Sequence, residues 1–254
     1  SSQSSQIRWS GPTSSCGYFR PGSLPTAIDA WRGVGAMPTE SGQLRCCFNG
    51  GVVLAGSFAQ LARAAEQSRD TMLVPKTALE TPPLEIHTLG AEVLRQPARR
   101  IGKVTEQTRE LARDMLRSMY TAKGIGLAAP QVGVHQQLLV IDLDLENATT
   151  PPLILINPEI SSASATIDTY EEGCLSIPGV YLDVVRPTAI EVSFRDEMGR
   201  PRKMKADGLM ARCIQHEMDH LNGVLFVDRV TDEAGLLKEL KDHGFQRQHV
   251  QSVS

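Results

Sequence analysis

The sequence predicts an α+β domain in which mostly antiparallel sheets pack around one central helix. Three observations predict this class. Apolar residues recur at helical spacing before residue 124, short apolar segments bounded by turn residues fill the middle of the chain, and helical patterns return after residue 206. Strands grouped between helices are typical of the α+β class. We therefore expect an N-terminal helix, a central helix and a C-terminal helix in this domain.

We expect three parts in the chain: a largely disordered leader and linker, residues 1–83, a folded domain, residues 84–245, and a polar tail, residues 246–254. The first 40 residues are rich in Ser and Gly, contain three Arg and only two acidic residues, and show no sustained periodicity. Such a composition resembles that of organelle transit peptides, and a disordered tail is the alternative. The leader therefore predicts an organellar protein, with a plastid favoured over a mitochondrion. A bacterial-type cytoplasm is expected if the leader is not a targeting peptide.

The composition argues against several classes of protein. Of the 254 residues, 41% are hydrophobic and 22% are charged, which is typical of a soluble chain with a substantial core. The net charge of −3 gives no indication of binding to nucleic acid or to an anionic membrane. Five unevenly spaced Cys argue against a disulfide framework and for a reducing compartment. No apolar run reaches the ~18 residues that a membrane-spanning helix needs.

The individual elements follow from periodicity and turn residues. Apolar residues from Thr108 to Tyr120 at helical spacing predict a helix over residues 105–123. Apolar runs predict the strands, and the segment 196–199 predicts a tight turn between the last two. A final helix, residues 231–243, begins with acidic residues and is followed by Gly244. The predicted strands are residues 137–143, 153–157, 170–177, 181–185, 188–195 and 201–205.

The central helix, residues 207–223, carries the pattern His-Glu-x-x-His. Because successive residues turn by about 100°, His216 and His220 lie about 40° apart on one face and can bind one metal ion. Glu217 lies beside that face, where a general base is expected. Leu209, Arg212 and Cys213 project on the same side and are expected to wall the site. A surface or core histidine is the ordinary alternative for either ligand.

Two histidines leave a catalytic metal site incomplete, because such sites usually take three protein ligands. Cys174 is the candidate for the third ligand, since it lies between Glu172-Gly and Leu-Ser176 rather than in an apolar run. A thiolate and two imidazoles leave the fourth tetrahedral position open for water. The alternative for a lone Cys is a small buried apolar residue.

Small residues fill Gly124–Gln131, read as GIGLAAPQ. Such residues let the backbone approach a ligand closely. A dinucleotide-binding loop is a weak candidate, because no strand precedes the segment and half of that pattern is missing. A turn from helix to strand and a substrate-lining role are left open by the residue types alone.

Three separated blocks together resemble the peptide deformylase family. They are GIGLAAPQ at Gly124–Gln131, EGCLS at Glu172–Ser176 and QHEMDH at Gln215–His220, in this order. The resemblance covers about residues 84–244, and the segment IPGVYLDVVRP after EGCLS is similar to the type 1B members of bacteria and plastids. It implies an α+β fold and a hydrolase that removes the N-formyl group from the initiator Met of nascent polypeptides and releases formate.

The resemblance also implies roles for individual residues. Cys174, His216 and His220 would hold the metal, and Glu217 would be the acid and base. Gln131, through its side-chain amide, and Leu175, through its backbone N–H, would bind the developing oxyanion. The remaining expected residues are Gly124, Ile125, Gly126, Gly173, Leu209, Arg212 and Cys213 around the substrate, with Glu172 and Arg186 orienting the site.

The expected cofactor is one divalent ion. The ligand types alone favour Zn²⁺, whereas the family resemblance implies Fe²⁺, with Zn²⁺, Ni²⁺ or Co²⁺ as substitutes. The expected partners are N-formyl-Met nascent polypeptides near the ribosome exit. Direct binding of nucleic acid and binding to a membrane are not predicted, and the oligomeric state is left open.

Two other functions share parts of this pattern. A zinc endopeptidase uses the same His-Glu-x-x-His helix but usually takes its third ligand downstream, where this chain offers no distinct partner. A non-catalytic module stabilised by a metal is the other alternative, and Glu217 argues against it, because a structural site does not need an unligated carboxylate beside the metal.

Overall fold

A computed structural model describes residues 45–48, 51–54 and 72–253 of the chain. It divides into two units, residues 1–65 and 66–254. In the first unit, β1 (Arg45–Phe48) pairs in antiparallel fashion with β2 (Gly51–Leu54). The sequence analysis did not predict these two strands. The rest of the expected leader upstream of residue 72 lies outside the described residues.

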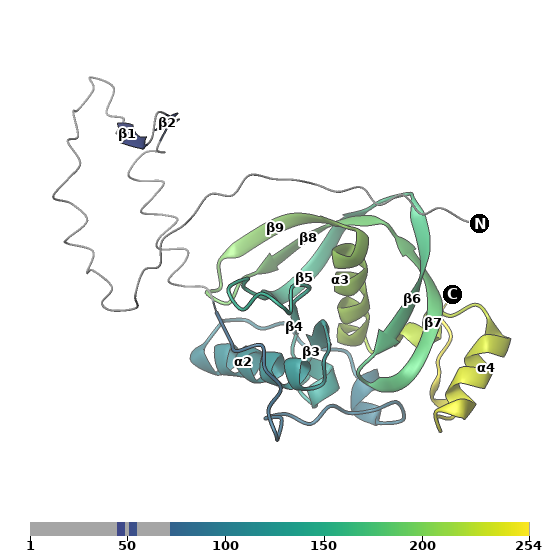
Figure 1. Cartoon of the computed structure of the whole chain (residues 1–254). Helices are drawn as coiled ribbons and strands as arrows, with labels where there is room; N and C mark the ends of the chain where they lie inside the picture. Colours follow the sequence, from purple (N-terminus) through teal and green to yellow (C-terminus); the bar gives the residue numbers. More distant parts are fainter. Residues whose placement is uncertain (1–44, 49–50, 55–71, 254) are drawn as a thin grey trace, which may run out of the picture. The chain divides into compact units, whose positions relative to one another are not determined.

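The second unit contains a five-stranded antiparallel sheet (Figure 1). The strand order is β3-β4-β5-β8-β9. Strands that follow one another in the chain are therefore neighbours in the sheet, except that β8 lies next to β5 because β6 and β7 form a separate sheet. The strands span Gly126–Ala128 (β3), Leu138–Ile141 (β4), Leu153–Ala163 (β5), Ala189–Arg195 (β8) and Pro201–Asp207 (β9).

Two further strands form a separate antiparallel ribbon. β6 (Ile167–Cys174) pairs with β7 (Ile177–Pro187), and the pairing shifts by a bulge between Gly173 and Cys174. The central helix α3 (Gly208–Leu221) runs between this ribbon and the sheet (Figure 1). Residues from the ribbon and from α3 can therefore meet at one site.

Two helices complete the unit, as the sequence predicted. α2 (Glu106–Thr121) begins at Thr105, whose hydroxyl accepts from the Thr108 N–H, an arrangement that satisfies a free donor at a helix start. α4 (Glu233–Asp242) begins at Asp232 in the same way and packs beside β7. Short 3₁₀ segments span Glu92–Arg95, Ala129–Val132, Phe226–Arg229 and Arg247–His249.

The predicted α+β class is confirmed, and each of the six predicted strands overlaps an observed strand. The predicted strand 170–177 is wrong at its end, because β6 stops at Cys174 and Ile177 begins β7, and β3 was not predicted. The packed region also passes both expected domain boundaries. Val74 is buried in the core upstream of residue 84, and Val250 is buried downstream of residue 245. Sequence composition missed both ends because each contributes only one buried apolar side chain within a polar, Pro-containing or Gln-rich stretch.

The core gathers in three clusters, which cover the α2 face of the sheet, the α3 face of the sheet, and the contact between the ribbon and α4. Ile214 and Leu221 of α3 lie in the second cluster, so the helix buries its apolar stripe against the sheet. The opposite side of α3 thereby faces the ribbon. Among the described residues, no helix is both long enough and apolar enough to span a bilayer.

Candidate metal centre

The three expected metal ligands lie together. His216 and His220 are on successive turns of α3, with ring centroids 5.2 Å apart, and Cys174 is the last residue of β6. The Cys174 Sγ is 3.2 Å from His220 Nε2, and one ligand atom from each residue lies within 4.8 Å of the other two. A thiol and two imidazoles therefore converge, which is the ligand number of a catalytic site with one position open.

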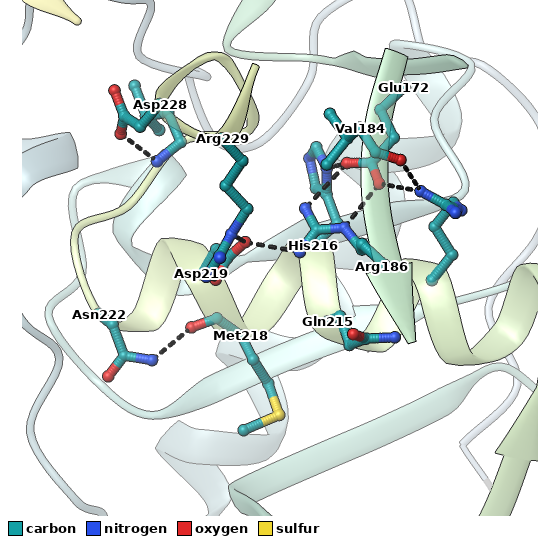
Figure 2. Close-up of polar contacts among 12 residues, drawn as sticks. Glu172, Val184, Arg186, Gln215, His216, Met218, Asp219, Asn222, Asp228 and Arg229 are labelled. Carbon is teal, nitrogen blue, oxygen red and sulfur yellow. Dashed lines mark hydrogen bonds and ion pairs between the residues drawn. The ribbon is translucent and has the colours of Figure 1, made fainter. Parts of the chain in front are cut away.

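Glu172 fixes the orientation of His216. Its Oε2 lies 2.9 Å from His216 Nδ1, which leaves Nε2 as the ring nitrogen that can bind a metal ion on the side of Cys174. Figure 2 shows the Glu172 carboxylate between His216 and Arg186. Burial alone would raise the pKa of Glu172, but the hydrogen bonds from Arg186 and His216 outweigh it and hold the pKa well below its ordinary value. Glu172 is thus a permanently charged acceptor that orients a ligand ring.

Asp219 extends this network along α3. Arg186 donates from Nε to Glu172 at 2.6 Å and from Nη1 to Asp219 at 2.8 Å. Arg229 donates to both oxygens of Asp219 at 2.6 Å each (Figure 2). The sequence analysis identified Glu172 and Arg186 but missed Asp219 and Arg229. The place of Asp219, three residues after His216, was a usable signal, whereas nothing in the sequence indicated Arg229.

Arg212 directs its charge into the same network. Its Nη1 donates to Glu172 Oε1 and to the Val184 carbonyl, both at 2.8 Å, and its Nη2 donates to the Asp168 carbonyl at 2.9 Å. The guanidinium carbon lies 5.6 Å from the centre of the Tyr170 ring. Arg212 does line the cavity, as expected, and it also neutralises the carboxylate that orients His216.

Glu217 is in the opposite environment. Its Oε2 is buried and has no hydrogen-bond partner among the described residues. A Cβ on Gly126 would overlap its carboxylate and would lie 3.0 Å from Cys213 Sγ, so a larger residue there would displace the Glu217 side chain. Burial raises the pKa of Glu217 to about 7. A carboxyl group with such a pKa is suited to both accepting and donating a proton near neutral pH.

Gln131 is pinned beside the sulfur of Cys174. Its Oε1 accepts from the Ala128 N–H at 2.8 Å, and its Nε2 donates to Ser176 Oγ at 3.1 Å and lies 3.5 Å from Cys174 Sγ. Because Oε1 is engaged with backbone, the NH₂ group is the end of the amide that faces the sulfur. Ser176 was not among the expected site residues.

A cavity of about 700 Å³ adjoins these groups. It is lined by the residues between α2 and β3, by the ribbon and by α3. All seven expected substrate-contacting residues line it: Gly124, Ile125, Gly126, Gly173, Leu209, Arg212 and Cys213. Tyr170 and Tyr181 also line it and were not expected.

Side chains pack directly against two further glycines of the cavity wall. A Cβ on Gly124 would lie 2.5 Å from Leu175 Cδ1, and a Cβ on Gly173 would lie 2.5 Å from Tyr181 Cε1. The small residues that the sequence offered therefore allow close approach of the two walls. Of the alternatives left open for residues 124–131, the turn from α2 into β3 is present, and Gly124, Ile125, Gly126 and Gln131 line the cavity, while contact with a substrate stays a prediction.

The donor set fits a divalent metal ion. The three ligand atoms are close enough to bind one ion, the orienting bond from Glu172 is of the kind that metal-bound histidines make, and the ligand types suit Fe²⁺ or Zn²⁺ alike. Cys174, His216 and His220 would hold the ion, with Glu217 beside it.

The family model for polypeptide deformylases matches residues 83–235. This chain belongs to the peptide deformylase family. A peptide deformylase of Parasynechococcus marenigrum is 96% identical over 201 residues, which are 79% of this chain and 100% of the relative. Peptide deformylase 2 of Prochlorococcus marinus is 74% identical over 200 residues, with the same coverage of both chains.

Solved peptide deformylases share the fold. The enzyme of Synechococcus elongatus, crystallised with actinonin, has 56% identity and a TM-score of 0.71, and the match covers 72% of this chain and 99% of that one. A plant peptide deformylase, PDF1B, has 38% identity and a TM-score of 0.60, covering 65% and 89%.

The chain is therefore a metal-dependent peptide deformylase, a hydrolase that removes the N-formyl group from the methionine of nascent polypeptides and releases formate. The predicted family and activity are confirmed. Neither the endopeptidase nor the non-catalytic module is supported.

Proposed function

We propose that Cys174, His216 and His220 hold the catalytic ion and that Glu217 transfers the protons of deformylation. The observation that carries this proposal is the buried, unpartnered carboxylate of Glu217 beside the three ligand atoms, at the wall of the cavity. A buried carboxylate without a partner is costly. Its retention beside a metal site is explained by a proton that it exchanges with the reactants.

Different residues carry out the separate steps of the reaction. When bound, the divalent ion supplies Lewis-acid activation of water and of the formyl carbonyl. Glu217 accepts the proton that the attacking water loses and donates a proton to the leaving nitrogen of methionine. The Gln131 NH₂ group and the Leu175 backbone N–H donate to the formyl oxygen as it gains negative charge. Formate and a free amino terminus result.

The cavity walls orient the peptide. Gly124, Ile125, Gly126 and Gly173 line the cavity, and their backbone would lie along an extended substrate chain bound there. Leu209, half exposed at the first turn of α3, and Cys213 offer apolar surface to the methionine side chain.

We infer that the native ion is Fe²⁺. The support for iron is the family resemblance, since the Cys/His/His set would also bind Zn²⁺, Ni²⁺ or Co²⁺. The test is anaerobic purification with elemental analysis, followed by removal of the metal and reconstitution with each ion. Formate release from a formyl-Met peptide should be highest with Fe²⁺. Equal turnover with Zn²⁺ in its place would exclude the preference for iron.

The cellular setting is proposed on the basis of the relatives. Cyanobacterial peptide deformylases match most of this chain, which supports action in a bacterial-type cytoplasm on polypeptides that leave the ribosome. The predicted organellar leader lies mostly outside the described residues and stays a prediction. Fusion of the first ~80 residues to a fluorescent reporter in plant cells tests it: a signal spread through the cytosol would exclude targeting to a plastid or mitochondrion.

A further inference from the structure

A second buried ionic cluster adjoins the wall of the substrate cavity. Lys76 Nζ lies 2.7 Å from Asp142 Oδ2, and the two side chains are only 4% and 2% exposed. The Tyr120 hydroxyl donates to the same oxygen at 2.7 Å, and Lys76 Nζ also donates to the Asp144 carbonyl at 2.7 Å. Lysine is almost never buried unless it is paired. The cluster therefore fixes the segment that carries Lys76 in one place.

That segment, residues 72–84, is here termed the strap. Its backbone is fixed to α2 at two points, from the Leu79 N–H to Thr121 Oγ1 at 3.1 Å and from the Leu84 N–H to Ser118 Oγ at 3.0 Å. Val74 is buried in the core cluster below α2. The family model matches only from residue 83, so the family match does not account for most of the strap.

The strap reaches the cavity through Asp142 and through the end of α2. The Asp142 N–H donates to the Ile125 carbonyl at 2.9 Å, and the Gly124 N–H donates to the Met119 carbonyl at 2.9 Å. Residues 122–126 all line the cavity. Lys76 thus holds the residue that anchors Ile125, and Leu79 bonds to Thr121, directly before the lining loop.

We propose that Lys76 is a positioning residue for substrate binding. Its ammonium group, paired with Asp142, holds residues 122–125 at the position where they line the cavity. The inference rests on the proposed contact between this loop and the peptide substrate. Lys76 touches neither the substrate nor the metal ligands, so its loss should alter binding of the peptide rather than the proton transfers at Glu217.

The experiment compares Lys76→Met, Lys76→Arg and Thr121→Val with the wild-type protein, and uses Lys241→Met, an exposed lysine of α4, as the control. KM and kcat are measured for a formyl-Met peptide. Amide hydrogen exchange is measured over residues 119–127 and 138–145, and this readout does not depend on turnover. Thr121→Val removes the hydroxyl that accepts from the Leu79 N–H at an exposed contact and that also donates to the Arg117 carbonyl within α2.

We expect Lys76→Met to raise KM about fivefold or more, to leave kcat within twofold, and to speed exchange in both segments. Lys76→Arg should restore most of the KM, Thr121→Val should raise KM about twofold, and Lys241→Met should change nothing. An unchanged KM in Lys76→Met overturns the proposal. Exchange that rises uniformly through the protein, with KM and kcat altered together, also overturns it, because the role would then be general stability.

If Lys76→Met does not fold, Asp142→Asn decides, because it leaves Lys76 without its charged partner, and an unchanged KM with unchanged local exchange in that variant overturns the proposal. The proposed function fails in a different way. Absence of formate release from the wild-type protein would refute deformylation, whereas the exchange measurements would still report whether Lys76 holds the loop.

Discussion

The carboxylates on the two sides of His216 differ in their hydrogen bonds and in their pKa. On one side, Glu172 accepts hydrogen bonds from Arg186, Arg212 and His216 and has a pKa held well below its ordinary value. On the other side, Glu217 is equally buried, has one oxygen without a partner among the described residues, and has a pKa raised by burial to about 7. The same side chain is a fixed anion in one place and a proton carrier in the other.

The difference shows that the hydrogen-bond partners which the fold supplies determine whether a glutamate stays charged or exchanges a proton. The side of His216 that carries Glu172 is here called the saturated side, because Arg186 of β7 and Arg212 of α3 both donate to this carboxylate of β6. Protonation of Glu172 would therefore break several hydrogen bonds at once. On the side of Glu217, no cation bonds to the carboxylate oxygen Oε2 among the described residues, and Gly126 leaves space for the carboxylate at the cavity wall. Substitutions on the first side should affect stability and metal affinity, and those on the second side should affect turnover.

The largest expected effect tests the cavity side directly. Glu217→Gln removes the proton acceptor but keeps the shape, so turnover should fall toward the upper end of the about 10²- to 10⁴-fold that general acid–base groups supply. Metal content and the unfolding midpoint should stay as in the wild-type protein. Glu110→Gln, at an exposed position of α2, is the matched control. Turnover retained in Glu217→Gln would refute the proposed proton transfer.

Gly126→Ala tests the same side through geometry. The added methyl group would overlap the Glu217 carboxylate, and a displacement of about 1 Å at a reacting group can lower the rate about 10²-fold. We expect a loss of kcat of that size with normal metal content. Gly102→Ala is the control, since nothing lies within 4 Å of its added Cβ. Equal activity of the two variants would show that the base does not need this space.

Glu172→Gln tests the saturated side. The neutral amide cannot hold His216 as the carboxylate does, so metal affinity should fall about 10- to 100-fold, the usual effect of losing a bond to a ligating histidine. Competition with a chelator measures the dissociation constant. Glu171→Gln, exposed and next in sequence, should leave metal affinity unchanged. The comparison fails if Glu172→Gln lowers kcat at saturating metal as much as Glu217→Gln does.

The sequence could predict the parts of the site that local spacing determines. The i, i+4 spacing of His216 and His220 and the adjacent Glu217 require only that residues 208–221 form a helix. Cys174 has no period of its own in a strand, so it is a candidate only because the two-histidine pattern lacks a third ligand and its neighbours are not apolar, and the resemblance to a family then supports it. The fold class also followed from local pattern, because short apolar segments are grouped between helical segments.

The rest depends on long-range contacts that leave no pattern. Arg229 reaches Asp219 from a 3₁₀ segment ten residues downstream, and nothing in the intervening Val- and Leu-containing stretch indicates it. Lys76 stands in a Pro-containing stretch that resembled a linker, yet its partner Asp142 lies 66 positions away, directly after β4. Arg212 was expected in the cavity wall. Its bond to Glu172 depends on how β6 packs against α3, which the sequence does not show.

The smallest expected effect separates the saturated network from ordinary surface pairs. Arg212→Met removes one charged donor from Glu172, which keeps those of Arg186 and His216, and it also removes the donors to the Val184 and Asp168 carbonyls. The free energy of unfolding should therefore fall by at least about 1.5 kcal/mol, the low end for one bond to a charged group. Arg109→Met, which breaks an exposed pair with Glu106, should cost at most about 0.5 kcal/mol. Urea denaturation at equal metal saturation measures both. Arg212 is largely buried, whereas Arg109 is more exposed. Equal losses of unfolding free energy in the two variants would therefore mean that the Glu172 network contributes no more to stability than a surface ion pair. The contrast between the two sides of His216 would then rest on Glu217 alone.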